Sequence, residues 1–101
     1  MKLDVLGLEA FIALAEQGRF GKAARQLHIT QTALTRRLQN FEELLGVQLV
    51  ERTTRSVALT QVGQAFLPQA RRLLGDLTAA LVELHETGKA QRGDVAIACV
   101  P

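Results

Sequence analysis

Apolar residues recur at intervals of three and four along the first 45 positions, which is typical of helices with one buried face. Gly18 and Gly46 are expected to end helices, and Asp4 and Thr30 are residue types that cap helix N-termini. Three helices are therefore expected, over about residues 4–17, 20–27 and 31–45. A short helix, a tight corner at His28 and a longer helix form the organisation of a helix-turn-helix, in which the second helix enters the DNA major groove.

The third of these helices has two different faces. Its apolar positions fall within about 60° of a helical wheel, and Thr32, Arg36 and Gln39 lie opposite them. Surface helices usually carry Glu/Lys pairs, whereas the first two turns here contain no carboxylate. A solvated surface helix is the alternative, but the pattern favours a groove-reading helix.

A polar turn at residues 53–56 separates two stretches of alternating, partly β-branched residues. Residues 47–52 and 57–59 are therefore expected to form a two-stranded hairpin, a wing. Arg52 and Arg55 in this hairpin could reach phosphates or a minor groove.

A long final helix is expected over about residues 61–91, capped by Thr60. At 1.5 Å per residue it would be about 45 Å long, too long to bury its apolar stripe against the preceding segment. Pro68 should kink it locally, and the alternative is a helix that begins after Pro68. The stripe resembles a coiled-coil seam and predicts a homodimer. Its dimerisation residues would be Phe66, Ala70, Leu73, Leu77, Leu81 and Leu84.

The end of the chain changes pattern after residue 92. Residues 95–100 are all apolar, which is typical of a buried strand, yet nothing in the chain offers such a strand a partner. The expected organisation is a winged helix-turn-helix at 1–59, a linker helix at 60–92 and the first strand of a further domain at 93–101. Cys99, the only cysteine, lies in the last part and suits a small buried residue.

Charge is concentrated in the middle of the chain. The net charge is +2, but the segment from Arg19 to Arg55 contains seven basic and three acidic side chains. This excess favours contact with a polyanion, although chance clustering on a solvated face is possible. The longest apolar runs, residues 10–15 and 95–100, are far below the roughly 18 residues of a membrane span, so we expect a cytoplasmic protein without a membrane partner.

Other function classes find little support. His28 and His85 are far apart, no glycine-rich phosphate loop follows a strand, and no zinc cluster is present, so neither an enzyme nor a bound cofactor is expected. The lack of Tyr and Trp disfavours single-stranded RNA recognition. A pure interaction module that binds no DNA remains a competing hypothesis.

The sequence resembles the N-terminal DNA-binding part of the LysR-type transcriptional regulators. The matching positions are Leu8, Phe11, Gly18, Phe20, Ala23, Ala24, Leu27, Thr30, Gln31, Ala33, Leu34, Thr35, Glu42, Leu45, Gly46, Leu49, Arg52, Arg55, Leu59, Thr60 and Gly63. The resemblance implies a mainly α fold, a winged helix-turn-helix of three helices and a two-stranded wing, with a dimerising linker helix. It also implies a C-terminal domain that senses a small-molecule inducer, tetramers of the full-length protein, and operators that are interrupted palindromes.

The resemblance further implies roles for single residues. The base-reading set would be Gln31, Thr32, Ala33 and Arg36. The phosphate and wing contacts would be Thr30, Thr35, Arg37, Gln39, Arg52 and Arg55. Two departures affect the operator: Arg19 replaces a frequent serine, and Thr32 replaces a frequent proline or serine.

Overall fold

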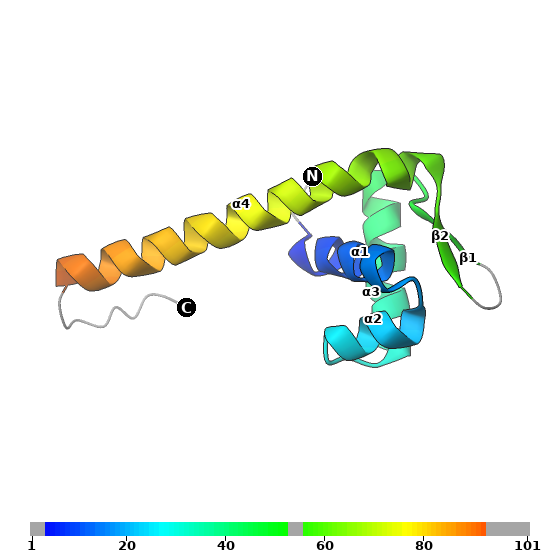
Figure 1. Ribbon diagram of the computed structural model, residues 1–101, viewed down its shortest axis with the longest axis horizontal. Helices are drawn as coiled ribbons and strands as arrows, with labels where there is room; N and C mark the ends of the chain where they lie inside the picture. Colours follow the sequence, from blue (N-terminus) through cyan, green and yellow to red (C-terminus); the bar gives the residue numbers. More distant parts are fainter. Residues whose placement is uncertain (1–3, 53–55, 93–101) are drawn as a thin grey trace.

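A computed structural model of the protein describes residues 4–52 and 56–92. Its elements are α1 (Val5–Gln17), α2 (Phe20–Gln26), α3 (Gln31–Leu45), β1 (Val50–Arg52), β2 (Val57–Leu59) and α4 (Gln61–Arg92). The first three helices and the hairpin gather at one end of α4, whose other end projects away from them (Figure 1). The predicted winged helix-turn-helix with a long final helix is confirmed.

The ends of the helices follow the capping residues in the sequence. The side chains of Asp4 and Thr30 accept hydrogen bonds from the N–H groups of Gly7 and Ala33, at 2.9 and 3.0 Å. Gly18 and Gly46 adopt the left-handed conformation directly after α1 and α3, with φ of 73° and 76°. These local signals explain why the predicted bounds of α1 and α3 agree with the structure.

The corner between α2 and α3 uses a left-handed residue that is not glycine. His28 has φ of 59°, and the next N–H, of Ile29, donates to the carbonyl oxygen of Ala24 at 3.0 Å. Leu27 caps α2, so this helix ends one residue earlier than predicted. The left-handed turn redirects the chain sharply and sets the start of α3 beside α2.

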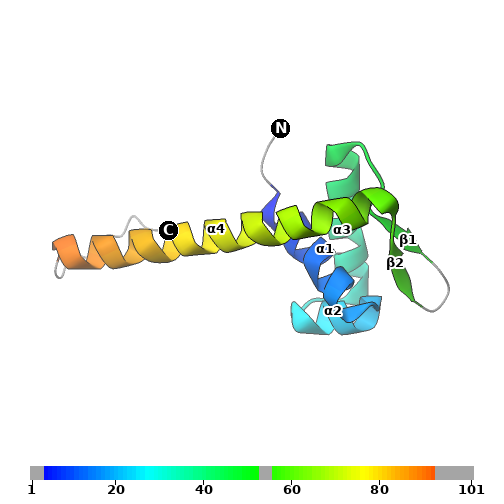
Figure 2. The same cartoon turned by 45° about the horizontal axis from the view of Figure 1, so that its top comes forward.

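The core forms where the apolar faces of α1, α3 and the start of α4 meet (Figure 2). Phe66 of α4 stacks on Phe11 of α1, with ring centroids 5.6 Å apart, and lies 6.4 Å from the ring of Phe41 in α3. A Cβ atom on Gly7 would lie 2.6 Å from the Cβ of Phe41, so α1 and α3 cross in close contact there. The largest fully buried side chains are Phe11, Leu14, Leu34, Leu38, Leu49 and Val50.

The wing is shorter than the sequence pattern predicted. β1 and β2 pair antiparallel, with Val50 opposite Leu59, but residues 47–49 are not part of the strand. Leu49 and Val50 are consecutive and both buried, which breaks the alternation of a half-exposed strand. The Glu42 carboxylate instead accepts hydrogen bonds from their two N–H groups, at 2.7 and 3.1 Å.

Helix α4 runs without interruption through Pro68, so the alternative of a helix that begins after this residue is excluded. The local kink at Pro68 stays a prediction. Thr60 caps the helix, because its hydroxyl oxygen accepts the N–H of Gly63 at 3.0 Å. No helix in residues 4–52 and 56–92 combines the length and the apolarity that crossing a membrane requires.

Two residues of the predicted dimer stripe belong to the core of their own chain. Phe66 is half-buried against Phe11 and Phe41, and Ala70 has 0% exposure. Their positions in the stripe are correct, but the surface left for a second chain begins further along α4. The predicted strand at 93–101, including Cys99, lies outside the described residues.

Candidate nucleic-acid interface

The N-terminal half of α3 has a polar outer side and an apolar inner side that packs in the core. Leu34 and Leu38 are fully buried on the inner side of the helix. On the outer side Thr30, Gln31, Thr32, Arg36 and Gln39 are exposed, and Ala33, Thr35 and Arg37 are partly exposed. All eight site residues predicted on α3 and its N-cap are thus at least partly exposed.

Thr30 combines a structural and a possible binding role. Its Oγ1 accepts the N–H of Ala33, which fixes the first turn of α3. A hydroxyl group has one donor hydrogen in addition to its acceptor lone pairs. The same side chain can therefore cap the helix and donate to an anionic oxygen.

The positive charge on this surface is not neutralised by any carboxylate of the neighbouring sequence. No Asp or Glu occurs between Glu16 and Glu42. Neither Arg36 nor Arg37 forms an ion pair within residues 4–52 and 56–92. An exposed guanidinium group with five N–H donors suits the paired acceptors of a guanine or a phosphate.

Helix α2 lies directly beside the first turn of α3. A Cβ atom built on Gly21 would be 3.6 Å from Nε2 of Gln31, an ordinary van der Waals contact. Lys22 and Arg25 are exposed on α2, and Arg19 is exposed at its N-cap. No single-residue role was predicted for Lys22 and Arg25, which flank the buried pair Ala23 and Ala24.

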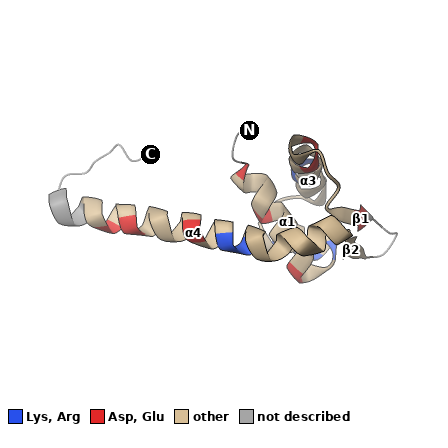
Figure 3. Ribbon diagram, turned by 90° about the horizontal axis from the view of Figure 1, so that it is seen from above, with Lys and Arg blue, Asp and Glu red and all other residues tan. Residues whose placement is uncertain are grey.

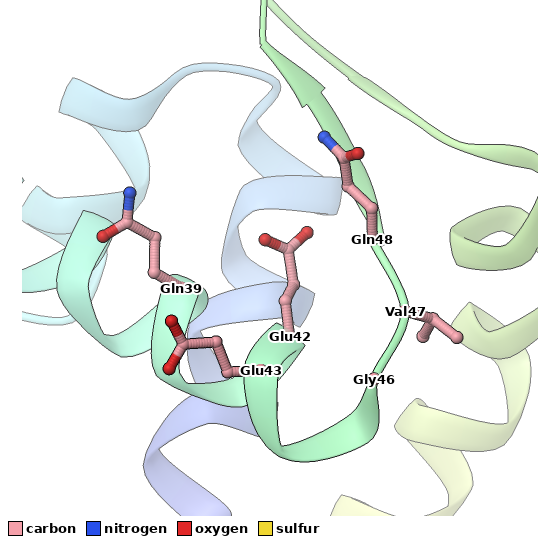
Figure 4. Close-up of a pocket in the computed structure, with 6 residues that line it drawn as sticks. All are labelled: Gln39, Glu42, Glu43, Gly46, Val47 and Gln48. Atoms are coloured by element: carbon pink, nitrogen blue, oxygen red, sulfur yellow. The ribbon is translucent and has the colours of Figure 1, made fainter.

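The electrostatic character changes toward the end of α3. A shallow, open hollow there is lined by Gln39, Glu42, Glu43, Gly46, Val47 and Gln48 (Figure 4). The Glu42 side chain points into the space between α3 and the segment before β1, and Val47 points away from it (Figure 4). Two carboxylates make this end unsuitable for phosphate, so a nucleic-acid surface would end near Gln39.

The wing positions are defined only in part. Arg52 ends β1 and pairs with Val57 of β2, and the N–H of Val57 donates to the carbonyl oxygen of Gly18 at 3.1 Å. This bond attaches the wing to the end of α1. The side chain of Arg52 and the whole of Arg55 lie outside the described residues, so their roles stay predictions.

Across residues 4–52 and 56–92, no group of three or more His, Cys, Asp or Glu side chains is placed to hold a metal ion.

Comparison with known families gives a match to most of the winged helix-turn-helix. A family model described as bacterial regulatory helix-turn-helix protein, lysR family, matches residues 6–64. The chain belongs to the LysR family of bacterial regulators. The LysR-type match covers α1–α3, the wing and the first turn of α4, so the predicted family is confirmed.

Curated LysR-type relatives extend the similarity along the chain. The HTH-type transcriptional regulator YbhD of Escherichia coli K12 is 46% identical over 101 residues, which are 100% of this chain and 32% of that protein. The regulator ClcR of Pseudomonas putida is 45% identical over 91 residues, 90% of this chain and 31% of ClcR. The chain thus spans about a third of the length of these relatives, which are transcriptional regulators rather than enzymes.

Solved LysR-type structures share the fold. The crystal structure of a complex of the CbnR DNA-binding domain with DNA matches with a TM-score of 0.78 and 38% identity, covering 85% of this chain and 99% of that one. The structure of Vibrio fischeri DarR in complex with DNA matches with a TM-score of 0.83 and 30% identity, covering 89% of this chain and 31% of DarR. The LysR-type winged-helix fold is therefore shown by sequence and structure together.

Proposed function

We propose that this chain binds double-stranded DNA as the sequence-specific module of a LysR-type transcriptional regulator. Helix α3 enters the major groove, and the wing contacts the backbone or the minor groove. The observation that carries the proposal is the exposed, carboxylate-free N-terminal half of α3, whose inner side chains Leu34 and Leu38 are fully buried. The CbnR and DarR structures, each in complex with DNA, support it.

In this proposal some residues of α3 contact the bases and others contact the DNA backbone. Gln31 and Arg36 read bases, because glutamine pairs with adenine and arginine with guanine, each contributing about 1–3 kcal/mol of discrimination. Thr32 and Ala33 complete the surface that faces the bases. Backbone and wing contacts come from Thr30, Thr35, Arg37, Gln39, Arg52 and Arg55.

The second part of the proposal is a homodimer formed through α4. Leu73, Leu81 and Leu84 are exposed along one stripe, and Leu77 is half-buried within it. Two winged helices joined in this way read the two halves of an interrupted palindrome, which raises affinity through effective concentration. The full-length protein would be a cytoplasmic tetramer whose further domain binds an inducer, with no cofactor held by this chain.

The base-reading role can be tested with duplexes selected from a random library. Arg36→Ala and Gln31→Ala should each weaken binding to the selected operator by about 1–3 kcal/mol and barely change binding to random duplex. Arg55→Ala should weaken both and reduce the salt slope by about one unit. Gel-shift titrations at several salt concentrations measure these effects.

Two outcomes would contradict the proposal. An equal loss on all sequences for Arg36→Ala would exclude base reading by this residue. Absence of any salt-sensitive binding to duplex DNA would instead support a pure interaction module. Arg71→Ala serves as control, because this arginine is exposed on α4 and lies outside the proposed interface.

A further inference from the structure

Helix α2 contains a glycine that its backbone conformation does not require. Gly21 is the second residue of this short helix, and it is exposed. Among the described glycines only Gly18 and Gly46 have a positive φ, so alanine could adopt the backbone conformation of Gly21. Glycine is also a poorer helix former than alanine, because it loses more conformational freedom on folding. The reason for a glycine here therefore lies in what a side chain would meet.

The side chain of Gln31 occupies the space next to Gly21. Apart from the backbone of α2 and the two chain neighbours, a Cβ atom on Gly21 would have one heavy-atom neighbour within 4 Å among the described residues. This neighbour is Nε2 of Gln31, at 3.6 Å. The Gln31 amide forms no hydrogen bond within residues 4–52 and 56–92. It therefore lies against bare backbone, with its hydrogen-bonding groups available to a ligand.

The orientation of this amide matters for the proposed reading of adenine. A glutamine pairs with adenine through two hydrogen bonds, so its amide group has to lie in the plane of the base edge. An exposed glutamine side chain has several rotatable bonds and loses much of this freedom when it is ordered. A neighbour that limits or permits one orientation of Gln31 therefore changes how strictly the base is selected.

We infer that Gly21 is a positioning residue for base reading, which leaves free the space that the Gln31 amide occupies. This inference rests on the proposed DNA binding and adds a residue of α2 that determines operator preference through a side chain of α3. A branched side chain at position 21 would fill the space and turn the Gln31 amide away. The displaced atoms are the end of a flexible, exposed side chain, so the change affects base preference rather than folding.

Gly21→Val tests the inference, because valine carries two methyl groups on Cβ and is stiff about χ1. The measured quantity is the ratio of affinities for the selected operator and for an operator in which one base pair is replaced. The pair to replace is the one whose identity no longer matters in Gln31→Ala. Gly21→Val should lower this ratio by about 5- to 150-fold, as much as Gln31→Ala does. The two substitutions combined should cause no further loss, because both act through one side chain.

Gly75→Val is the matched control, since a Cβ atom on Gly75 would meet nothing within 4 Å among the described residues. This glycine lies on α4 between Arg72 and Asp76, away from α3 (Figure 3), and its substitution should leave the ratio unchanged. An unchanged ratio in Gly21→Val, or additive losses in the combined variant, would overturn the inference while base reading stands. An unchanged ratio in Gln31→Ala would instead overturn the proposed base reading by Gln31, and the inference with it.

A second measurement applies even if Gly21→Val does not fold. Gly21→Ala adds a methyl group at ordinary van der Waals distance from the Gln31 amide and raises the helix propensity of α2, so this variant should fold. In NMR spectra of the variant without DNA, we expect a nuclear Overhauser effect between the added methyl group and the side-chain amide protons of Gln31. Its absence would overturn the inference, because Gln31 would then not occupy the space beside position 21.

Discussion

At the scale of single residues, Gly63 allows the first turn of α4 to lie in close contact with the segment before β1, because glycine has no Cβ atom. A Cβ atom at this position would lie 2.2 Å from the carbonyl oxygen of Leu49, a backbone atom that also accepts the N–H of Thr60 at 3.0 Å. Gly63→Ala would force the first turn of α4 away from the segment before β1. We expect a loss of about 1–3 kcal/mol in the free energy of unfolding, measured by urea titration.

The same helix offers a matched control for this substitution. A Cβ atom added to Gly75 of α4 would meet no other side chain or distant backbone atom within 4 Å among the described residues. Gly75→Ala should therefore stabilise the protein by about 0.5–1 kcal/mol, since alanine restricts the unfolded chain and favours the helix. Equal effects of the two substitutions would show that Gly63 is not in close contact with Leu49.

At the scale of elements, Glu42 attaches the reading helix to the wing. Its carboxylate accepts hydrogen bonds from the N–H groups of Leu49 and Val50, at the start of β1. Without this carboxylate the two N–H groups would lose these hydrogen bonds. Glu42→Ala should lower the free energy of unfolding by about 1.5–3 kcal/mol, the range for hydrogen bonds to charged groups. Hydrogen exchange should accelerate at both amides.

Variants at and beside this position separate the hydrogen bonds from the charge. Glu42→Gln keeps an acceptor oxygen and should retain most of the stability, whereas Glu43→Ala removes an exposed neighbouring carboxylate and should change little. Unchanged exchange at Leu49 and Val50 in Glu42→Ala would show that this link does not hold the wing.

The elements also show which features the sequence could predict. Caps and stops at Thr30, Thr60 and Gly46 act within one turn of the chain, so the bounds of α3 and the start of α4 followed from local chemistry. The polar face of α3 was predictable for the same reason, because a helical wheel requires only the helix itself. The approach of Gly21 to Gln31 depends on the angle between two helices, which no sequence period encodes.

Tertiary contacts explain the remaining differences. Phe66 continues the apolar spacing of α4 as regularly as Leu81, yet only Phe66 meets the rings of α1 and α3. The early part of the predicted first strand does not form, and the N–H group of Leu49 there donates to the Glu42 carboxylate at the end of α3. Both cases involve partners that the pattern along one element cannot reveal.

At the scale of the whole molecule, α4 is much longer than its own domain can cover. Its 32 residues extend about 48 Å, and the last of them that packs against the core is Leu74. Most of the stability of a helix in a protein comes from the packing of its apolar face rather than from helix propensity. The exposed leucines on the projecting half of α4 in Figure 1 suit the second copy of the same helix that we propose.

The dimer is tested by charges placed on and off the stripe. Leu81 and Val82 are adjacent and almost equally exposed, at 56% and 54%, but Val82 points to the other side of α4. Leu81→Glu with Leu84→Glu should yield monomers in sedimentation experiments and sharply weaken operator binding, because buried carboxylates oppose association. Val82→Glu should leave the dimer intact, since its charge stays in water. Dimers that persist in the double variant, or dissociate equally in Val82→Glu, would exclude this stripe as the dimer contact.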